Sequence, residues 1–182
     1  MSVVIGLKHE DEVWVASDGR FIDTSNNIIQ VGEYDKVIKN GKYLLGYVGE
    51  VRTAQLMVSR YFTPPEDIFN FPQSIIKMLR THGALIVSDT EVKNSACDFL
   101  IAYDDKLFEL DSDFSLVEIE KYVAIGSGDS QALSSLRTTE GMTMEIEERI
   151  RLALQVTCSF VTCCQPPFFV KTTKGKNFRW DS

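Results

Sequence analysis

The stretch SVVIGLKHEDEVWVASDGR, residues 2–20, decides the fold. Its two runs 2–8 and 13–17 are rich in β-branched and aromatic side chains, which favour strands, and the charged segment HEDE separates them. This pattern predicts a β-hairpin. Because the second strand of a hairpin runs back along the first, Asp18 is expected to return close to Ser2.

The rest of the chain predicts alternating groups of strands and helices. The expected further strands span residues 27–31, 35–39, 43–48, 98–103, 106–110, 115–119, 121–126 and 167–172. The expected helices span residues 50–61, 66–80, 129–139 and 145–161. Antiparallel strands with helices gathered in pairs are typical of α+β layers. We expect two sheets face to face with helices outside, as one domain over residues 2–172 followed by a basic, solvated tail over 173–182.

Composition restricts the class of protein. The chain has 182 residues, of which 44% are hydrophobic, and this suits one domain with a sizeable core. The formal net charge of −7 disfavours binding to nucleic acid, which requires Lys and Arg to neutralise phosphates. The apolar runs are too short to cross a bilayer, and the start of the chain turns acidic too early for a signal peptide. We therefore expect a cytoplasmic protein that binds neither nucleic acid nor a membrane.

The four cysteines do not predict a metal site. They are Cys97, Cys158, Cys163 and Cys164, and none of them forms a CxxC pair. The chain has only two histidines that could complete a zinc site. We expect free thiols, mostly buried, with no metal and no cofactor.

The first candidate catalytic residue is Ser2. Methionine followed by a small residue is normally trimmed, and Ser2 would then carry both a hydroxyl and a free α-amine. An α-amine titrates near pH 7.7–8.0, so part of it is neutral at pH 7 and can accept the hydroxyl proton without a histidine. Taken alone this feature is unspecific, because many cytosolic proteins begin with Met-Ser.

Two charged residues could complete such a site. Asp18 follows the second strand, where a turn aspartate is the ordinary alternative. Lys36 begins a strand and could equally face solvent. If Lys36 faces the interior it needs a counter-ion, which Asp18 could supply, and its ammonium would then lower the pKa of the α-amine and stabilise an alkoxide.

Two glycine-containing turns complete the candidate site. Gly49 lies between a strand and a helix, where a backbone N–H could hold an oxyanion. Ser127 lies in the similar turn Gly126-Ser127-Gly128, before another helix. Its ordinary alternative is a residue that caps the helix.

Together these segments resemble the proteasome β-subunit family and its bacterial relative, the HslV peptidase. The resemblance covers about residues 2–172 and rests on the order and spacing of several short segments. They are Ser2-Val3-Val4-Ile5-Gly6, Ser17-Asp18-Gly19-Arg20, Lys36-Val37-Ile38, LLGYVG over 44–49, DFLIAY over 98–103 and AIGSG over 124–128. The resemblance implies a four-layer αββα sandwich and hydrolysis of peptide bonds by an N-terminal nucleophile.

The resemblance also implies roles for individual residues. Ser2 would attack, with its own amine as base, and Lys36 with Asp18 would tune both groups. The Gly49 N–H would hold the oxyanion and Ser127 would orient the amine. Substrate side chains would meet Phe21, Ile22, Tyr47 and Val51. The implied substrate is a peptide or unfolded protein, and the implied assembly is a homo-oligomeric ring, often served by an unfolding ATPase.

Two departures from the family pattern keep a second interpretation open. Serine replaces the usual threonine at the nucleophile position, and Val161 stands where the family has an aspartate near the end of the last helix. The alternative to a threonine-type peptidase is a catalytically inactive subunit with a structural or assembly role in a ring. An amidohydrolase acting on a non-peptide amide would use the same chemistry.

Overall fold

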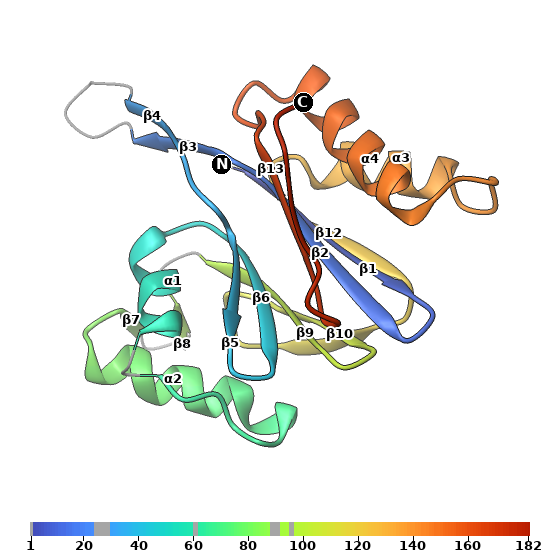
Figure 1. The fold of residues 1–182 in the computed structure, drawn as a ribbon. Helices are drawn as coiled ribbons and strands as arrows, with labels where there is room; N and C mark the ends of the chain where they lie inside the picture. Colours follow the sequence, from blue (N-terminus) through green and yellow to red (C-terminus); the bar gives the residue numbers. More distant parts are fainter. Residues whose placement is uncertain (1, 24–29, 60–61, 88–91, 95–96) are drawn as a thin grey trace.

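Two antiparallel five-stranded sheets lie face to face in the computed structural model of the chain (Figure 1). The structure describes residues 2–23, 30–59, 62–87, 92–94 and 97–182, without the side chains of 22–23, 30–32, 58, 85–87 and 92–94. The first sheet has the order β12 (Tyr122–Gly126), β1 (Val3–His9), β2 (Glu12–Asp18), β13 (Phe168–Thr172) and β14 (Asn177–Trp180). The second has the order β11 (Leu116–Ile119), β10 (Lys106–Leu110), β9 (Asp98–Tyr103), β6 (Tyr43–Val48) and β5 (Val37–Asn40).

Helices cover the outer face of each sheet (Figure 1). Helices α3 (Asp129–Thr138) and α4 (Ile146–Phe160) pack on the first sheet, and α1 (Val51–Val58) and α2 (Phe71–Thr81) pack on the second. The predicted four-layer αββα sandwich is therefore confirmed. Among the described residues, no helix is long and apolar enough to span a membrane.

The β1 strand shows why the hairpin sequence specifies this architecture. Val3, Ile5 and Leu7 face the helix layer, where they pack with residues of α3 and α4. Val4 faces the second sheet and joins the core between the sheets. Because successive strand residues point to opposite faces, a strand covered on both sides must be apolar at nearly every position.

Several predicted elements differ from the structure in detail. The helix expected over 66–80 is a short 3₁₀ turn, η2 (Ile68–Asn70), followed by α2. The strand expected over 27–31 falls mostly outside the described residues, and β4 (Gln30–Glu33) pairs with an unpredicted strand β3 (Arg20–Asp23). A second unpredicted ribbon joins β7 (Leu85–Val87) to β8 (Val92–Asn94).

The prediction of a solvated tail over 173–182 is wrong for residues 177–180. These residues form β14, which pairs with β13 and extends the first sheet. Phe178 stacks on Trp14 with ring centroids 5.9 Å apart, so the segment also covers part of the core. The sequence prediction missed this strand because its two apolar side chains alternate with polar ones and basic residues lie close by.

Candidate active site

The hairpin brings Ser2 and Asp18 together at one end of the sandwich. Val4 lies opposite Ser17 in the register of β1 and β2, so Asp18 lies beside the residues that precede Val4. The backbone N–H of Val3 donates to Asp18 Oδ1 at 2.9 Å. Asp18 is fully buried and Ser2 is 6% exposed, so this contact is shielded from bulk water.

Lys36 completes a buried ion pair with Asp18. Its Nζ donates to the backbone oxygen of Asp18 at 2.6 Å and to Asp18 Oδ1 at 3.1 Å. The other carboxylate oxygen accepts from the Arg20 N–H at 3.0 Å, so the buried carboxylate is well satisfied. Burial lowers the pKa of Lys36 below the usual value of a lysine, although the Asp18 carboxylate opposes this effect.

The carbonyl of Ser2 is held from the opposite side. Ser127 lies after β12, and its Oγ donates to the backbone oxygen of Ser2 at 3.3 Å. Gly126 has a φ of +99°, and a Cβ atom at this position would lie 2.4 Å from the Ser2 oxygen. Only glycine fits this approach. The Ser2–Val3 peptide is thus fixed at its oxygen by Ser127 and at its N–H by Asp18.

Cys163 contacts the same group of residues from the turn that follows α4. Its Sγ lies 3.2 Å from Ser127 Oγ, and the residue is 6% exposed. All four cysteines keep their thiols and none of them is in a disulfide, as the sequence predicts. Three of them are buried, and Cys158 is half-buried.

A small hollow of about 60 Å³ opens beside Ser2. Its walls come from the residue before β1, from β3, from the segment before β5, from the end of β6 and from the turn into α1. The lining residues are Ser2, Arg20, Phe21, Tyr34, Lys36, Tyr47, Val48, Gly49 and Val51. Gly49 has a φ of +110°, which allows the chain to turn sharply between β6 and α1.

Aromatic side chains form one wall of the hollow. Phe21 and Tyr34 have ring centroids 6.3 Å apart, and Tyr34 meets Tyr47 edge-on at the same distance. Burial raises the pKa of Tyr47, and the neighbouring Tyr34 hydroxyl raises it further. Tyr47 therefore stays protonated near neutral pH and contributes a neutral wall, not a base.

The structure brings most of the residues expected from the sequence to this one place. Six of them line the hollow, and Asp18 and Ser127 contact the Ser2–Val3 peptide directly. The side chain of Ile22 lies outside the described residues. Sequence reasoning missed Arg20, Tyr34 and Val48 as lining residues, although Arg20 belongs to the Asp-Gly-Arg segment and Tyr34 lies two residues before Lys36.

Arg20 links this wall to the turn after α4. Its Nη1 donates to the backbone oxygen of Thr162 at 2.8 Å. The neighbouring Gly19 N–H donates to the backbone oxygen of Gln165 at 3.1 Å. These bonds fix the turn that carries Cys163 against the end of β2.

Comparison with solved structures identifies the architecture. BPH from Thiobacillus denitrificans aligns with a TM-score of 0.78 at 21% identity, over 93% of this chain and 96% of that chain. Eukaryotic HslV from Trypanosoma brucei aligns with a TM-score of 0.70 at 16% identity, over 93% and 98%. Anbu, an ancestral beta-subunit, from Yersinia bercovieri aligns with a TM-score of 0.74 at 12% identity, over 99% and 87%.

The chain has a proteasome-type, HslV-like fold. At these low identities the similarity is one of fold. No family model and no curated protein matches the sequence. BPH has also been solved in complex with epoxomicin.

One position of this proteasome-type fold lacks the expected carboxylate. Val161 follows α4 as its C-cap residue, and its N–H donates to the backbone oxygen of Thr157 at 2.8 Å. Its side chain packs against the core beneath α3 and α4. The side chain at position 161 therefore carries no charge that could act on the α-amine of Ser2.

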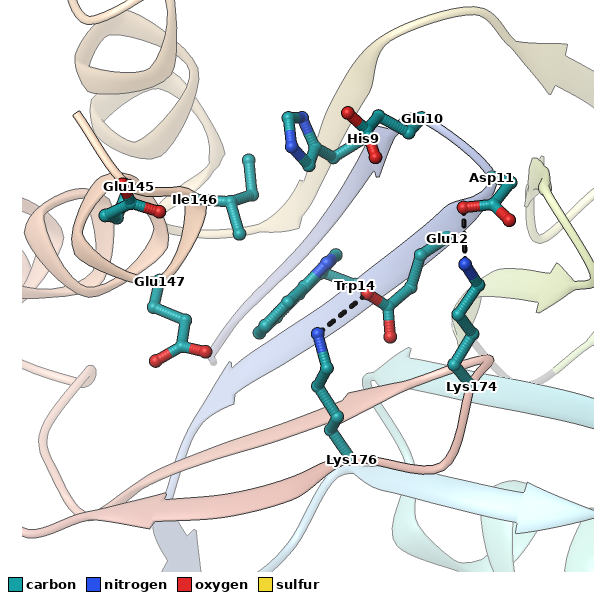
Figure 2. A pocket seen from close by; sticks show the side chains of 10 residues that line it. All are labelled: His9, Glu10, Asp11, Glu12, Trp14, Glu145, Ile146, Glu147, Lys174 and Lys176. Carbon is teal, nitrogen blue, oxygen red and sulfur yellow. Dashed lines mark hydrogen bonds and ion pairs between the residues drawn. The ribbon is translucent and has the colours of Figure 1, made fainter. Parts of the chain in front are cut away.

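A larger pocket lies at the other end of the β1–β2 hairpin (Figure 2). Its volume is about 490 Å³, and ten residues line it: His9, Glu10, Asp11, Glu12, Trp14, Glu145, Ile146, Glu147, Lys174 and Lys176. Both lysines form ion pairs there, Lys174 with Asp11 and Lys176 with Glu12. The lining offers no hydroxyl or thiol nucleophile. The smaller hollow beside Ser2 is therefore the better candidate for chemistry, despite its size.

Proposed function

We propose that this chain is a peptidase subunit of the proteasome and HslV type, in which Ser2 becomes the N-terminal nucleophile once Met1 is removed. One observation carries the proposal. Ser2, Asp18 and Lys36 are each at most 6% exposed, and Ser2 and Lys36 line the same hollow. Asp18 Oδ1 accepts from the N–H of Val3, the residue after Ser2, at 2.9 Å and from Lys36 Nζ at 3.1 Å. A hydroxyl, a carboxylate and an ammonium in one buried place suit covalent catalysis.

The α-amine acts as the general base in the acylation step. It takes the proton from Ser2 Oγ, and the oxygen attacks the carbonyl carbon of the substrate. The carbonyl oxygen becomes an oxyanion, for which the Gly49 N–H is the proposed donor. The amine then gives the proton to the leaving nitrogen, the C–N bond breaks, and an ester on Ser2 remains.

Lys36 supplies the electrostatic conditions for this step. Its ammonium favours the neutral α-amine, because two positive charges close together repel. The same ammonium stabilises negative charge as it develops on Ser2 Oγ. Asp18 keeps Lys36 charged in a buried position and also fixes the Ser2–Val3 peptide.

Deacylation repeats the same proton transfers with water as the nucleophile. The amine accepts a proton from the water, the hydroxide adds to the ester carbon, and the proton returns to Ser2 Oγ as the C–O bond breaks. No cofactor is needed for this sequence, because one residue supplies both nucleophile and base.

The proposed substrates are peptides or unfolded proteins, whose side chains would meet Phe21, Ile22, Tyr47 and Val51. We also propose a cytoplasmic homo-oligomeric ring, with an unfolding ATPase as a partner, on the basis of the resemblance. An inactive subunit of such a ring is the second candidate. The neutral Val161 favours it, because the α-amine then lacks the support of a carboxylate at that position.

Covalent labelling tests the proposal. Removal of Met1 is expected in the intact mass of the protein purified from cells. A peptide epoxyketone should then add one equivalent at residue 2, because its two electrophilic centres match the hydroxyl and the free amine of an N-terminal serine. Ser2→Ala should abolish both labelling and peptide hydrolysis, whereas Ser134→Ala, in the exposed part of α3, should retain both.

Two outcomes would contradict the proposal. A protein that keeps Met1 and resists the probe would support the inactive ring subunit. A protein that loses Met1 but is labelled elsewhere would reject Ser2 as the nucleophile.

A further inference from the structure

The thiol of Cys163 lies against the residue that holds the Ser2 carbonyl. Its Sγ is 3.2 Å from Ser127 Oγ, and Ser127 Oγ is in turn 3.3 Å from the Ser2 oxygen. Cys163 comes from the turn after α4, whereas Ser127 comes from the turn after β12. Two segments distant in the sequence therefore meet directly behind the nucleophile.

The direction of these hydrogen bonds follows from counting protons. A serine hydroxyl has one proton, and Ser127 donates it to the Ser2 carbonyl. In the contact with Cys163, Ser127 Oγ can then only accept. The thiol must donate, which gives a chain from the Cys163 S–H to Ser127 Oγ and from the Ser127 O–H to the Ser2 oxygen.

These two consecutive hydrogen bonds favour one orientation of the Ser127 hydroxyl. A serine side chain has three staggered rotamers, and a single weak bond to a carbonyl selects poorly among them. A second bond from a buried thiol adds a preference for the rotamer in which Ser127 reaches Ser2. The Ser2–Val3 peptide then stays fixed at both its oxygen and its N–H, which holds in place the backbone that carries the Ser2 hydroxyl and amine.

We propose that Cys163 is a positioning residue for the N-terminal nucleophile. It acts through Ser127 and touches neither the substrate nor the reacting atoms. The proposal rests on the proposed function. It supports the Ser2 carbonyl through neutral groups, in a chain whose residue 161 is an uncharged valine.

The other two cysteines near this turn do not share the role. Cys164 is fully buried in the core beneath α3 and α4, and Cys158 lies half-buried on α4. Neither forms a hydrogen bond with Ser127 among the contacts of the described residues. Cys158→Ala is therefore a matched control, since it removes a nearby thiol that forms no hydrogen bond with Ser127 among the described residues.

The test measures kcat and KM separately for Cys163→Ala, Cys163→Ser and Cys158→Ala in the full-length, Met1-processed protein. Removing one neutral hydrogen bond predicts that Cys163→Ala lowers kcat by about fivefold with KM nearly unchanged. Cys163→Ser should recover most of this loss, because a hydroxyl can donate in the same direction. Cys158→Ala should behave as wild type. The rate of epoxyketone labelling should follow kcat across the series.

Two results would overturn the inference while leaving the proposed function intact. One is an active wild-type enzyme whose Cys163→Ala variant keeps the wild-type kcat. The other is a Cys163→Ser variant as slow as Cys163→Ala, which would indicate a packing role. A processed wild-type protein that neither hydrolyses peptides nor reacts with the probe would reject both proposals together.

Discussion

The two ends of the β1–β2 hairpin each carry a lysine–aspartate ion pair, but in opposite surroundings. At the Ser2 end, the side chains of Lys36 and Asp18 are 6% and 0% exposed. At the other end, beside the larger pocket, those of Lys174 and Asp11 are 50% and 73% exposed. Water and salt screen the second pair, so it has little influence on its surroundings. The first pair is shielded, and its charge can act on neighbouring groups.

The difference shows why pocket size is a poor guide to chemistry in this molecule. The larger pocket holds more charged residues, yet both of its lysines are engaged with carboxylates, and the Lys174–Asp11 pair is open to water (Figure 2). The small hollow places a buried ammonium beside a hydroxyl. Electrostatic stabilisation of a developing charge is strongest where water is excluded.

Breaking the buried pair should give the largest effect. Lys36→Met removes the ammonium and leaves the Asp18 carboxylate uncompensated, so we expect peptide hydrolysis to fall by about 10³-fold. The free energy of unfolding should fall by about 3 kcal/mol, because an unpaired buried charge is costly. Hydrolysis assays and urea denaturation would measure the two effects.

A double variant separates the effect of the ion pair on hydrolysis from its effect on the free energy of unfolding. Asp18→Asn combined with Lys36→Met removes both charges and should recover part of the lost stability, although the Asn amide cannot accept from both Val3 and Arg20. Activity should stay as low as in the single variant. Activity within tenfold of wild type in Lys36→Met would show that the buried ammonium is not needed.

The pH dependence of activity should sharpen the comparison. Because burial lowers the pKa of Lys36, its ammonium should be lost below the usual lysine value of 10.5, and kcat/KM should decline there. In this pH window the unfolded chain keeps the lysine proton that the folded chain has lost. The contribution of Lys36 to the free energy of unfolding therefore rises with pH while activity falls.

That opposite trend distinguishes titration of Lys36 from alkaline unfolding. Lys36→Arg provides a control, since a guanidinium stays protonated and should move the alkaline limb of kcat/KM to higher pH even if the plateau is lower. An alkaline limb at the same pH in wild type and Lys36→Arg would assign it to another group.

The sequence predicts the positions of the candidate residues well where local pattern determines them. The hairpin over residues 2–17 places Asp18 beside Ser2 through strand register alone. The change from strand to helix at Gly49 is also local. After this glycine, the spacing of apolar residues changes from that of a strand to that of a helix. These features depend on neighbours in sequence, so one sequence is sufficient to predict them.

The missed features depend on contacts between distant segments. Cys163 meets Ser127 across 36 positions, and Tyr34 lies at the hollow because β4 pairs with β3 and the Tyr34 N–H donates to the Gly19 oxygen. β14 was missed because alternating polar residues on an edge strand resemble a solvated tail. Tertiary packing, not local propensity, decides each of these placements.

Breaking the exposed pair should give the smallest effect. Asp11→Asn or Lys174→Gln should leave peptide hydrolysis and the urea midpoint close to wild type, because the pair is open to water. Lys176→Gln is the matched comparison at the same pocket, since its partner Glu12 is only 7% exposed and one of its oxygens is already buried without a partner among the described residues. That variant should lower the urea midpoint measurably while leaving hydrolysis unchanged. If Asp11→Asn were as destabilising as Lys36→Met, exposure would not be what separates the two ends of the hairpin.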